Sequence, residues 1–132
     1  MKNLLLLAML GAAAPALAAT PQDILQSHAA EAKQEDASFK EFSASRGERF
    51  FHAKSAKGNS CATCHTDNPK AEGKHERTGK AIAPLAPVAN RERITDPAKV
   101  EKWFKRNCQD VLARACTRQE KGDFLAYLLS VK

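Results

Sequence analysis

The sequence predicts an all-α fold, and three observations support this prediction. Thr20-Pro21 and Asp96-Pro97 each place a capping residue directly before proline, which is a typical start of a helix. The run from Thr117 to Glu120 has the spacing of a capping box. The alternation of apolar and polar residues that marks a half-buried strand is absent. We therefore expect a domain built from helices.

The first 18 residues read as a secretory signal peptide. Lys2 supplies the positive start, residues 4–10 are apolar, and Ala16-Leu17-Ala18 is a small-residue cleavage site. The apolar run is too short to span a bilayer, although an uncleaved anchor is the alternative. We expect cleavage after Ala18 and a single periplasmic domain over residues 19–132. No later apolar run has the length of a membrane helix, so the cleaved protein is not expected to be an integral membrane protein.

The first two helices of this domain are expected at about residues 21–35 and from Ser43 or Ser45 to about Lys54. The first is polar and is expected to be peripheral. In the second, Gly47 lies about one turn from Phe50 and Phe51, so another helix can approach closely at the glycine. Residues 55–60 are expected to be a loop.

Cys61-Ala62-Thr63-Cys64-His65 carries the clearest chemical signal. Cys-x-x-Cys-His is the attachment site of a c-type haem, in which two thiols bind the porphyrin and the histidine is the proximal iron ligand. A thioredoxin-like redox pair would need a βαβ context, which is not seen. A zinc site would need Cys108, Cys116 or a histidine to complete four ligands, and Cys108 and Cys116 are spaced unlike typical zinc ligands. The motif therefore predicts one covalent haem c.

The rest of the chain is expected to surround this group. Residues 67–93 are rich in glycine, proline and lysine, and Pro84 and Pro87 exclude a regular helix there. A third helix begins at Pro97, with Val100, Phe104 and Asn107 on one face, and a short link joins Cys108 to Cys116. The last helix carries Phe124, Leu125, Leu128 and Leu129 on one side, and we expect it to cross the Gly47 helix.

Export and the cysteine count also predict how the remaining thiols are used. Disulfides persist outside the cytoplasm. If Cys61 and Cys64 hold haem, Cys108 and Cys116 are the only internal pair left.

The sixth iron ligand is not given by the motif. Methionine is the usual one, but Met1 and Met9 both belong to the predicted signal peptide. His28 and His52 are expected to be surface or packing residues, while His75 lies in a basic, flexible loop that would have to wrap around the ring edge to reach the iron. A lysine, Asn107 or an open position remain. An amide on an apolar helix face needs a partner, and Asn107 is either that ligand or an ordinary helix C-cap.

A series of segments resembles the SHP-type monohaem cytochromes c, which are relatives of cytochrome c double-prime. The segments are 77–87, Thr95-Asp96, 100–103, 106–108 and Cys116-Thr117. With the haem motif, the resemblance covers most of residues 45–130. It implies a small class I-like cytochrome c fold, with several helices around one covalent haem. It further implies His65 as proximal ligand, Asn107 as distal ligand, and a Cys108–Cys116 disulfide.

The resemblance implies a function, for which ligand chemistry gives a reason. An amide oxygen is a hard ligand that suits ferric iron better than ferrous iron, so reduction is expected to release Asn107. The opened ferrous site would then bind O2, NO or CO. We expect electron transfer with a multihaem or membrane cytochrome. A diatomic-ligand binder is the second hypothesis, and an enzyme that consumes NO is the third, because no peroxidase-like acid–base pair is identified.

Charge is consistent with a protein partner. The formal net charge of the chain is +6, and five lysines flank the haem motif, Lys54, Lys57, Lys70, Lys74 and Lys80. They are either a solvated surface or a ring that steers an acidic partner to the haem edge. Nucleic-acid binding is not expected, since the chain is exported, has few aromatics and lacks a basic helix pattern.

Overall fold

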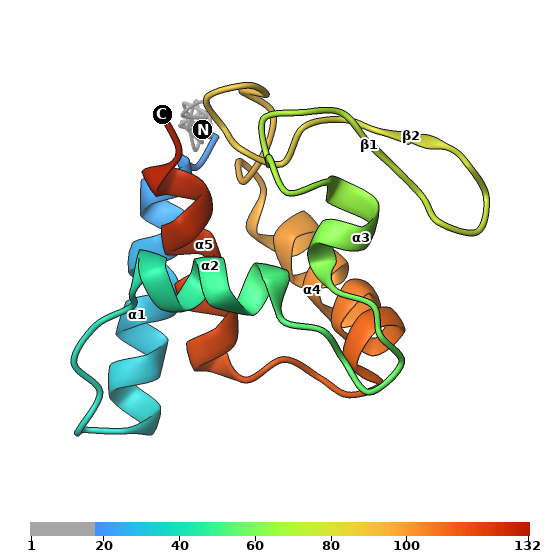
Figure 1. Cartoon of the computed structure of the whole chain (residues 1–132). Coiled ribbons are helices and arrows are strands. Elements are labelled where there is room, and N and C mark those ends of the chain that lie inside the picture. Colours follow the sequence, from blue (N-terminus) through green and yellow to red (C-terminus); the bar gives the residue numbers. More distant parts are fainter. Residues whose placement is uncertain (1–17) are drawn as a thin grey trace, which may run out of the picture.

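The computed structural model describes residues 18–132, and within this range the chain is almost entirely helical. The helices are α1 (Pro21–Glu35), α2 (Ala44–His52), α3 (Cys61–His65), α4 (Pro97–Leu112) and α5 (Arg118–Ser130). Two short strands, β1 (Gly73–Lys74) and β2 (Ala81–Ile82), form an antiparallel ribbon. Figure 1 shows α2 crossing α5, α1 beside α5, and the ribbon extending away from the helices. The all-α prediction is confirmed.

The helix starts are set by local capping. Thr20 and Asp23 bond reciprocally at the start of α1, and Thr117 and Glu120 do the same at the start of α5. At the start of α4, the Asp96 side chain accepts a hydrogen bond from Lys99 N at 3.1 Å. These side chains satisfy N–H groups that have no partner in a first helical turn, which is why the starts could be read from the sequence.

Helix α2 crosses α5 in close contact (Figure 1). Gly47 of α2 is buried, and a Cβ placed there would lie 1.9 Å from Asp123 O of α5. One turn further along, the fully buried Phe51 packs on Phe124 and Tyr127, with ring centroids 6.2 and 5.6 Å away. The predicted crossed pair is therefore confirmed, with the glycine at the point of closest approach.

A buried carboxylate joins the two helices of this crossing. The Asp123 side chain, 5% exposed, accepts hydrogen bonds from Ser43 N at 2.6 Å and from Gln119 Nε2 at 2.9 Å. Those two bonds go to Oδ1, which also accepts from Arg46 Nη2 at 2.9 Å, while Arg46 Nε donates to Oδ2 at 2.7 Å. Both carboxylate oxygens are thus paired, which is the condition for burying a charge without a large penalty.

Helix α1 is less peripheral than the sequence suggested. It packs along α5 with Ile24, His28 and Ala32 facing inward. At its far end, Arg118 of α5 pairs with Glu31 and Glu35. The single inward row of buried residues explains why the helix reads as polar overall.

Helix α4 continues past Cys108, where the sequence suggested a link. It ends at Leu112, and the chain then turns through Ala113 in the left-handed region with φ 57°. No glycine or proline lies between Cys108 and Cys116, so nothing stops the helix earlier. Asn107 is therefore inside the helix, and its interpretation as a C-cap is wrong.

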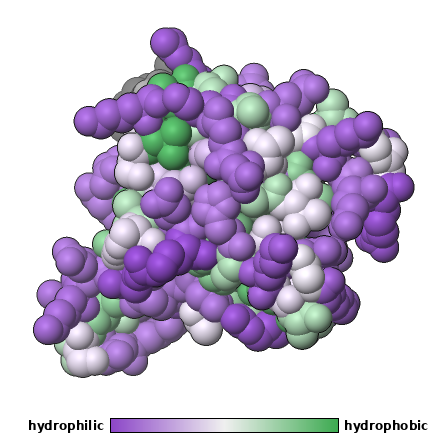
Figure 2. All heavy atoms as spheres, in the orientation of Figure 1, coloured by the Kyte–Doolittle hydropathy of each residue, from purple (hydrophilic) through white to green (hydrophobic). Residues whose placement is uncertain are grey.

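The described residues present a polar exterior. Figure 2 shows the face seen in Figure 1, on which hydrophilic residues predominate and apolar ones form only small areas. None of the helices between residues 18 and 132 is long and apolar enough to cross a membrane. The expected signal peptide, apart from Ala18, lies outside the described residues.

Candidate haem site

The Cys-x-x-Cys-His motif forms the short helix α3. Cys61 is its first residue, Cys64 lies one turn later, and His65 is its last residue. Ser60 N, just before the helix, donates to Thr63 Oγ1 at 2.9 Å and so orients the first turn. Both thiols are free and half-buried. Sequence spacing alone therefore brings two thiols and an imidazole together on one turn.

Burial sets the protonation of these groups. Burial, followed by the nearby charge of Arg93, lowers the pKa of His65 to about 4. Burial raises the pKa of the Cys61 thiol to about 11. A neutral imidazole is the form that binds iron, so burial keeps His65 in the form that a proximal ligand requires. The raised pKa keeps the Cys61 thiol protonated near neutral pH.

A glycine brings the ribbon against the motif. A Cβ on Gly73 of β1 would lie 2.2 Å from Cys64 O and 3.0 Å from His65 Cα. Only glycine permits this approach, so β1 supports the haem-motif helix from one side.

The proline-containing loop after β2 is held by backbone acceptors. Leu85 N and Ala86 N both donate to Pro69 O at 2.9 Å. Arg93 donates to Ala83 O at 2.7 Å and to Pro84 O at 2.8 Å. Arg93 therefore fixes this loop and also places a half-buried cation near His65. Sequence reasoning missed it, because nothing in the local pattern distinguishes Arg93 from the other arginines of the chain.

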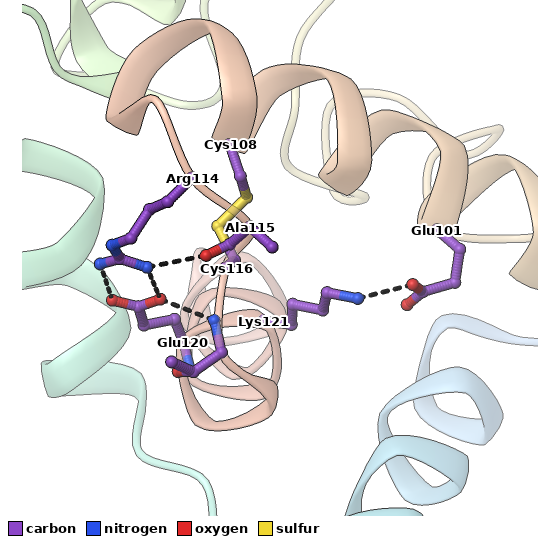
Figure 3. The surroundings of a disulfide bond; sticks show 8 residues. Glu101, Cys108, Arg114, Ala115, Cys116, Glu120 and Lys121 are labelled. Atoms are coloured by element: carbon purple, nitrogen blue, oxygen red, sulfur yellow. Dashed lines mark hydrogen bonds and ion pairs between the residues drawn. A yellow bond between two sulfur atoms is a disulfide. The ribbon is translucent and has the colours of Figure 1, made fainter.

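The alternatives to a haem motif lose their support. Within residues 18–132, no three His, Cys, Asp or Glu side chains are arranged to hold a metal ion. Cys108 and Cys116 are joined in a disulfide, with Cα atoms 5.6 Å apart, and are not free to complete a zinc site (Figure 3). The only sheet in this range is a two-stranded antiparallel ribbon, which is no βαβ unit.

Helix α4 has two adjacent faces of different character. Phe104 and Cys108, one turn apart, are buried in the core. Trp103 and Asn107, also one turn apart, are exposed, and Val100 on the same side is half-buried. The Trp103 side of α4 is therefore largely left exposed, although the Arg106 guanidinium lies 5.7 Å from the centroid of the Trp103 ring, and Asn107 lies on the same side one turn later.

The other histidines lie in separate surroundings. His28 is buried against α4, with its ring 6.3 Å from that of Phe104. His52 is exposed at the end of α2, with Nδ1 3.3 Å from Asp67. His75 lies in the loop between β1 and β2, where its Nδ1 accepts from Thr78 N at 3.3 Å.

These observations fit a covalently bound haem. Two free thiols and a neutral imidazole share one helical turn, and no other metal-binding chemistry is available to them in the described part of the chain. Trp103, 41% exposed, is the kind of large apolar side chain that a flat apolar group would cover. Cys61, Cys64 and His65 are the residues that would hold the haem.

Comparison with known proteins also indicates a c-type haem protein. Residues 37–128 match a family described as a domain of unknown function, DUF1924. Over 82 residues the chain is 49% identical to cytochrome c'' of Methylophilus methylotrophus, covering 62% of this chain and 57% of that protein. Over 69 residues it is 55% identical to the cytochrome c-type protein SHP of Cereibacter sphaeroides, covering 52% and 53%. The matched segments thus span only a little over half of these two relatives.

Solved structures match over a larger share. Oxidized cytochrome c'' of M. methylotrophus has a TM-score of 0.75 at 37% identity, covering 85% of this chain and 94% of that one. Oxidized SHP, described as an oxygen-binding cytochrome c, has a TM-score of 0.73 at 39% identity, covering 84% and 96%. A solution structure of cytochrome c'', concerned with haem-ligand detachment, has a TM-score of 0.72 at 38% identity, covering 83% and 92%.

The fold and the site thus define a c-type cytochrome, an all-α protein with a covalently bound haem. Within that class, the chain belongs to the DUF1924 family and to the SHP and cytochrome c'' group.

Proposed function

We propose that this chain is a periplasmic electron-transfer cytochrome whose distal ligand, Asn107, is released when the iron is reduced. The opened position then binds O2, NO or CO. Cys61 and Cys64 hold the haem, and His65 is the proximal ligand.

The observation that carries this proposal is the position of Asn107. Its side chain is exposed on the same side of α4 as Trp103. Within residues 18–132, no hydrogen bond occupies its amide oxygen. The amide would therefore be free to bind the iron of a haem that Cys61, Cys64 and His65 hold.

The other side chains considered as the distal iron ligand are less suited to that position than Asn107. Met1 and Met9 are the only methionines of the chain, and both fall in the expected signal peptide. His28 is turned into the contact between α1 and α4. His52 is paired with Asp67, and His75 is engaged in its own loop.

Ligand chemistry supplies the switch. When bound, the haem would supply a one-electron carrier and, once Asn107 is released, a site for diatomic molecules. Asn107 offers a neutral, hard oxygen, which holds ferric iron better than ferrous iron. The disulfide at the next residue limits how far α4 moves when the amide is released. Detachment of a haem ligand in cytochrome c'' supports this proposal.

The partner proposed for electron transfer is another cytochrome, multihaem or membrane-bound, with an acidic docking surface. The lysines on either side of the haem motif are exposed, which favours steering of such a partner toward the haem edge.

An absorption spectrum of the matured protein, ferric and then ferrous, tests the switch. We expect a low-spin ferric form, a high-spin ferrous form, and a spectral change when CO is added to the ferrous form. Low-spin bands in both states, unaffected by CO, would contradict the release of a ligand.

Two variants identify the ligand. Asn107→Ala should convert the ferric spectrum toward high spin, while His75→Ala should leave it unchanged. The opposite pattern would assign the distal position to His75.

A second candidate function is the binding or consumption of a diatomic ligand as the main role. Oxygen binding by SHP favours it. Turnover of NO by the reduced, oxygenated protein, well above that of free haem, would promote this candidate to an enzyme, whereas binding without turnover would leave it a carrier.

A further inference from the structure

One carboxylate ties α4 to two other helices. Glu101 of α4 lies with Oε2 2.6 Å from Lys121 Nζ of α5, which Figure 3 shows, and with Oε1 3.4 Å from His28 Nε2 of α1. We call His28, Glu101 and Lys121 the Glu101 clamp. It joins three helices at one point.

The clamp is the first of three attachments along one face of α4. Phe104, one turn later, packs on Phe124 of α5 with ring centroids 5.8 Å apart. Lys121 Nζ also lies 5.7 Å from the centroid of the Phe104 ring. Cys108, one further turn along, is bonded to Cys116 just before α5. Glu101, Phe104 and Cys108 therefore form one anchored row.

Asn107 stands beside this row. It is six residues from Glu101, about 9 Å along the helix axis, and it points from the adjacent face of α4. A small roll of α4 about its own axis would change the direction of the Asn107 amide. Apolar packing at Phe104 holds α4 against α5 but is non-directional, so it does not by itself define the roll angle of the helix. The disulfide fixes one end of the row, so a directional contact at Glu101 is needed to fix the other.

The electrostatic surroundings make Lys121 the main charged partner of Glu101. His28 is buried and faces Glu31 of its own helix, Glu101 of α4, and Lys121 and Arg118 of α5. Burial lowers the pKa of His28, so near neutral pH its ring is an uncharged contact. The group borders a cavity of about 250 Å³.

We propose that Glu101 is a positioning residue for the distal ligand, and that the Glu101 clamp holds α4 in the roll that directs Asn107 to the iron. This inference rests on the proposed role of Asn107. The clamp thereby sets how readily the distal position opens.

The test uses the ferric holoprotein and the ratio of high-spin to low-spin iron, measured by absorption and electron paramagnetic resonance. Glu101→Gln and Lys121→Met should each raise this ratio by about two- to fivefold, the range expected from a partly exposed ion pair. The double variant should exceed the larger single effect only slightly, because both substitutions remove one contact.

Asp110→Asn is the matched control. It removes a carboxylate from the same helix, nearer to Asn107, but the one ion pair of Asp110 within residues 18–132 is with Arg106 of α4 itself, at 3.9 Å. The ratio should stay at the wild-type value in this variant. An equal rise in Asp110→Asn would mean that charge, and not position, controls the ratio, and would overturn the inference.

The variant Asn107→Ala distinguishes a failure of the clamp inference from a failure of the proposed ligand role of Asn107. If it raises the high-spin ratio while Glu101→Gln and Lys121→Met do not, the clamp has no positioning role and the inference is overturned, although the proposed function stands. A lowered unfolding midpoint with an unchanged ratio leads to the same result, since it indicates a purely structural contact. If Asn107→Ala itself changes nothing, the proposed distal ligand is wrong and the clamp inference falls with it.

Discussion

Replacement of Gly47 by alanine should separate the two helices that organise this cytochrome. The new Cβ would lie 1.9 Å from Asp123 O, 2.5 Å from Asp123 C and 2.8 Å from Tyr127 Cβ. The close neighbours are mainly backbone atoms and cannot rotate away. The helices must part by about 1.5 Å to restore an ordinary contact of 3.4 Å.

The free-energy cost follows from opposing terms. Overpacking lowers the free energy of unfolding by about 1–3 kcal/mol. We use the upper value, about 3 kcal/mol, because backbone atoms must move to make room for the new Cβ. Parting the helices also loosens the packing of Phe51, for about 1 kcal/mol, while alanine gains about 1 kcal/mol in helix propensity. We expect the holoprotein to lose about 3 kcal/mol of unfolding free energy, measured by guanidinium denaturation followed by circular dichroism.

Gly122→Ala is the matched control, because it is also a glycine-to-alanine change inside a helix of the same crossing. Its Cβ would meet ring atoms of Phe42 at 2.2–2.4 Å, but that half-buried side chain can turn aside. We expect a loss of about 1 kcal/mol or less, since the helix propensity gained offsets most of the ring displacement. If Gly47→Ala costs no more than Gly122→Ala, backbone contact at the crossing does not limit the fold, and the reasoning is refuted.

Three further predictions concern the site and its supports. Arg93→Gln should lower the reduction potential by an amount on the order of tens of millivolts, because it removes a positive charge near His65. Arg93→Lys should stay closer to wild type, and equal potentials in all three proteins would contradict this role. Burial lowers the pKa of His28 below its ordinary 6.5. As pH falls below 6.5, the unfolded chain gains a proton that the native protein does not, so stability decreases until the pH reaches the native pKa. His28→Leu should lose less stability than wild type over that range in denaturant titrations, and parallel pH profiles would refute the effect. Finally, the double variant Cys108→Ala, Cys116→Ala should lower the unfolding free energy by about 2–3 kcal/mol. The disulfide closes a loop with a sequence separation of 8, and without it the unfolded chain gains conformational entropy. An unchanged guanidinium midpoint would show that the disulfide adds no stability.

Local patterns predicted much of this fold. The caps at Thr20, Asp96 and Thr117 are local bonds between residues three apart, so their spacing in the sequence carries the full signal. Gly47 and the following aromatics predicted a close helix crossing, and its partner proved to be α5 as expected. The short ribbon was missed, because strands of two residues are too short to show alternation.

The end of α4 was misjudged for a different reason. A cysteine pair suggested a link, but no helix-breaking residue follows Cys108. Helix propensity carries the chain to Leu112, and the disulfide is formed across the turn that follows.

By itself, the sequence determined the haem motif and the helix starts, because each depends on residues within a few positions of one another. The local pattern left Asn107 open between ligand and C-cap, and the family resemblance favoured the ligand. Only the tertiary structure brought Arg93 near His65 and made Glu101 a contact shared by three helices. Glu101 lies 20 residues before Lys121 and 73 residues after His28 in the chain. Contacts over such distances depend on how helices pack, and packing is set by buried surface across the whole domain and not by any local pattern.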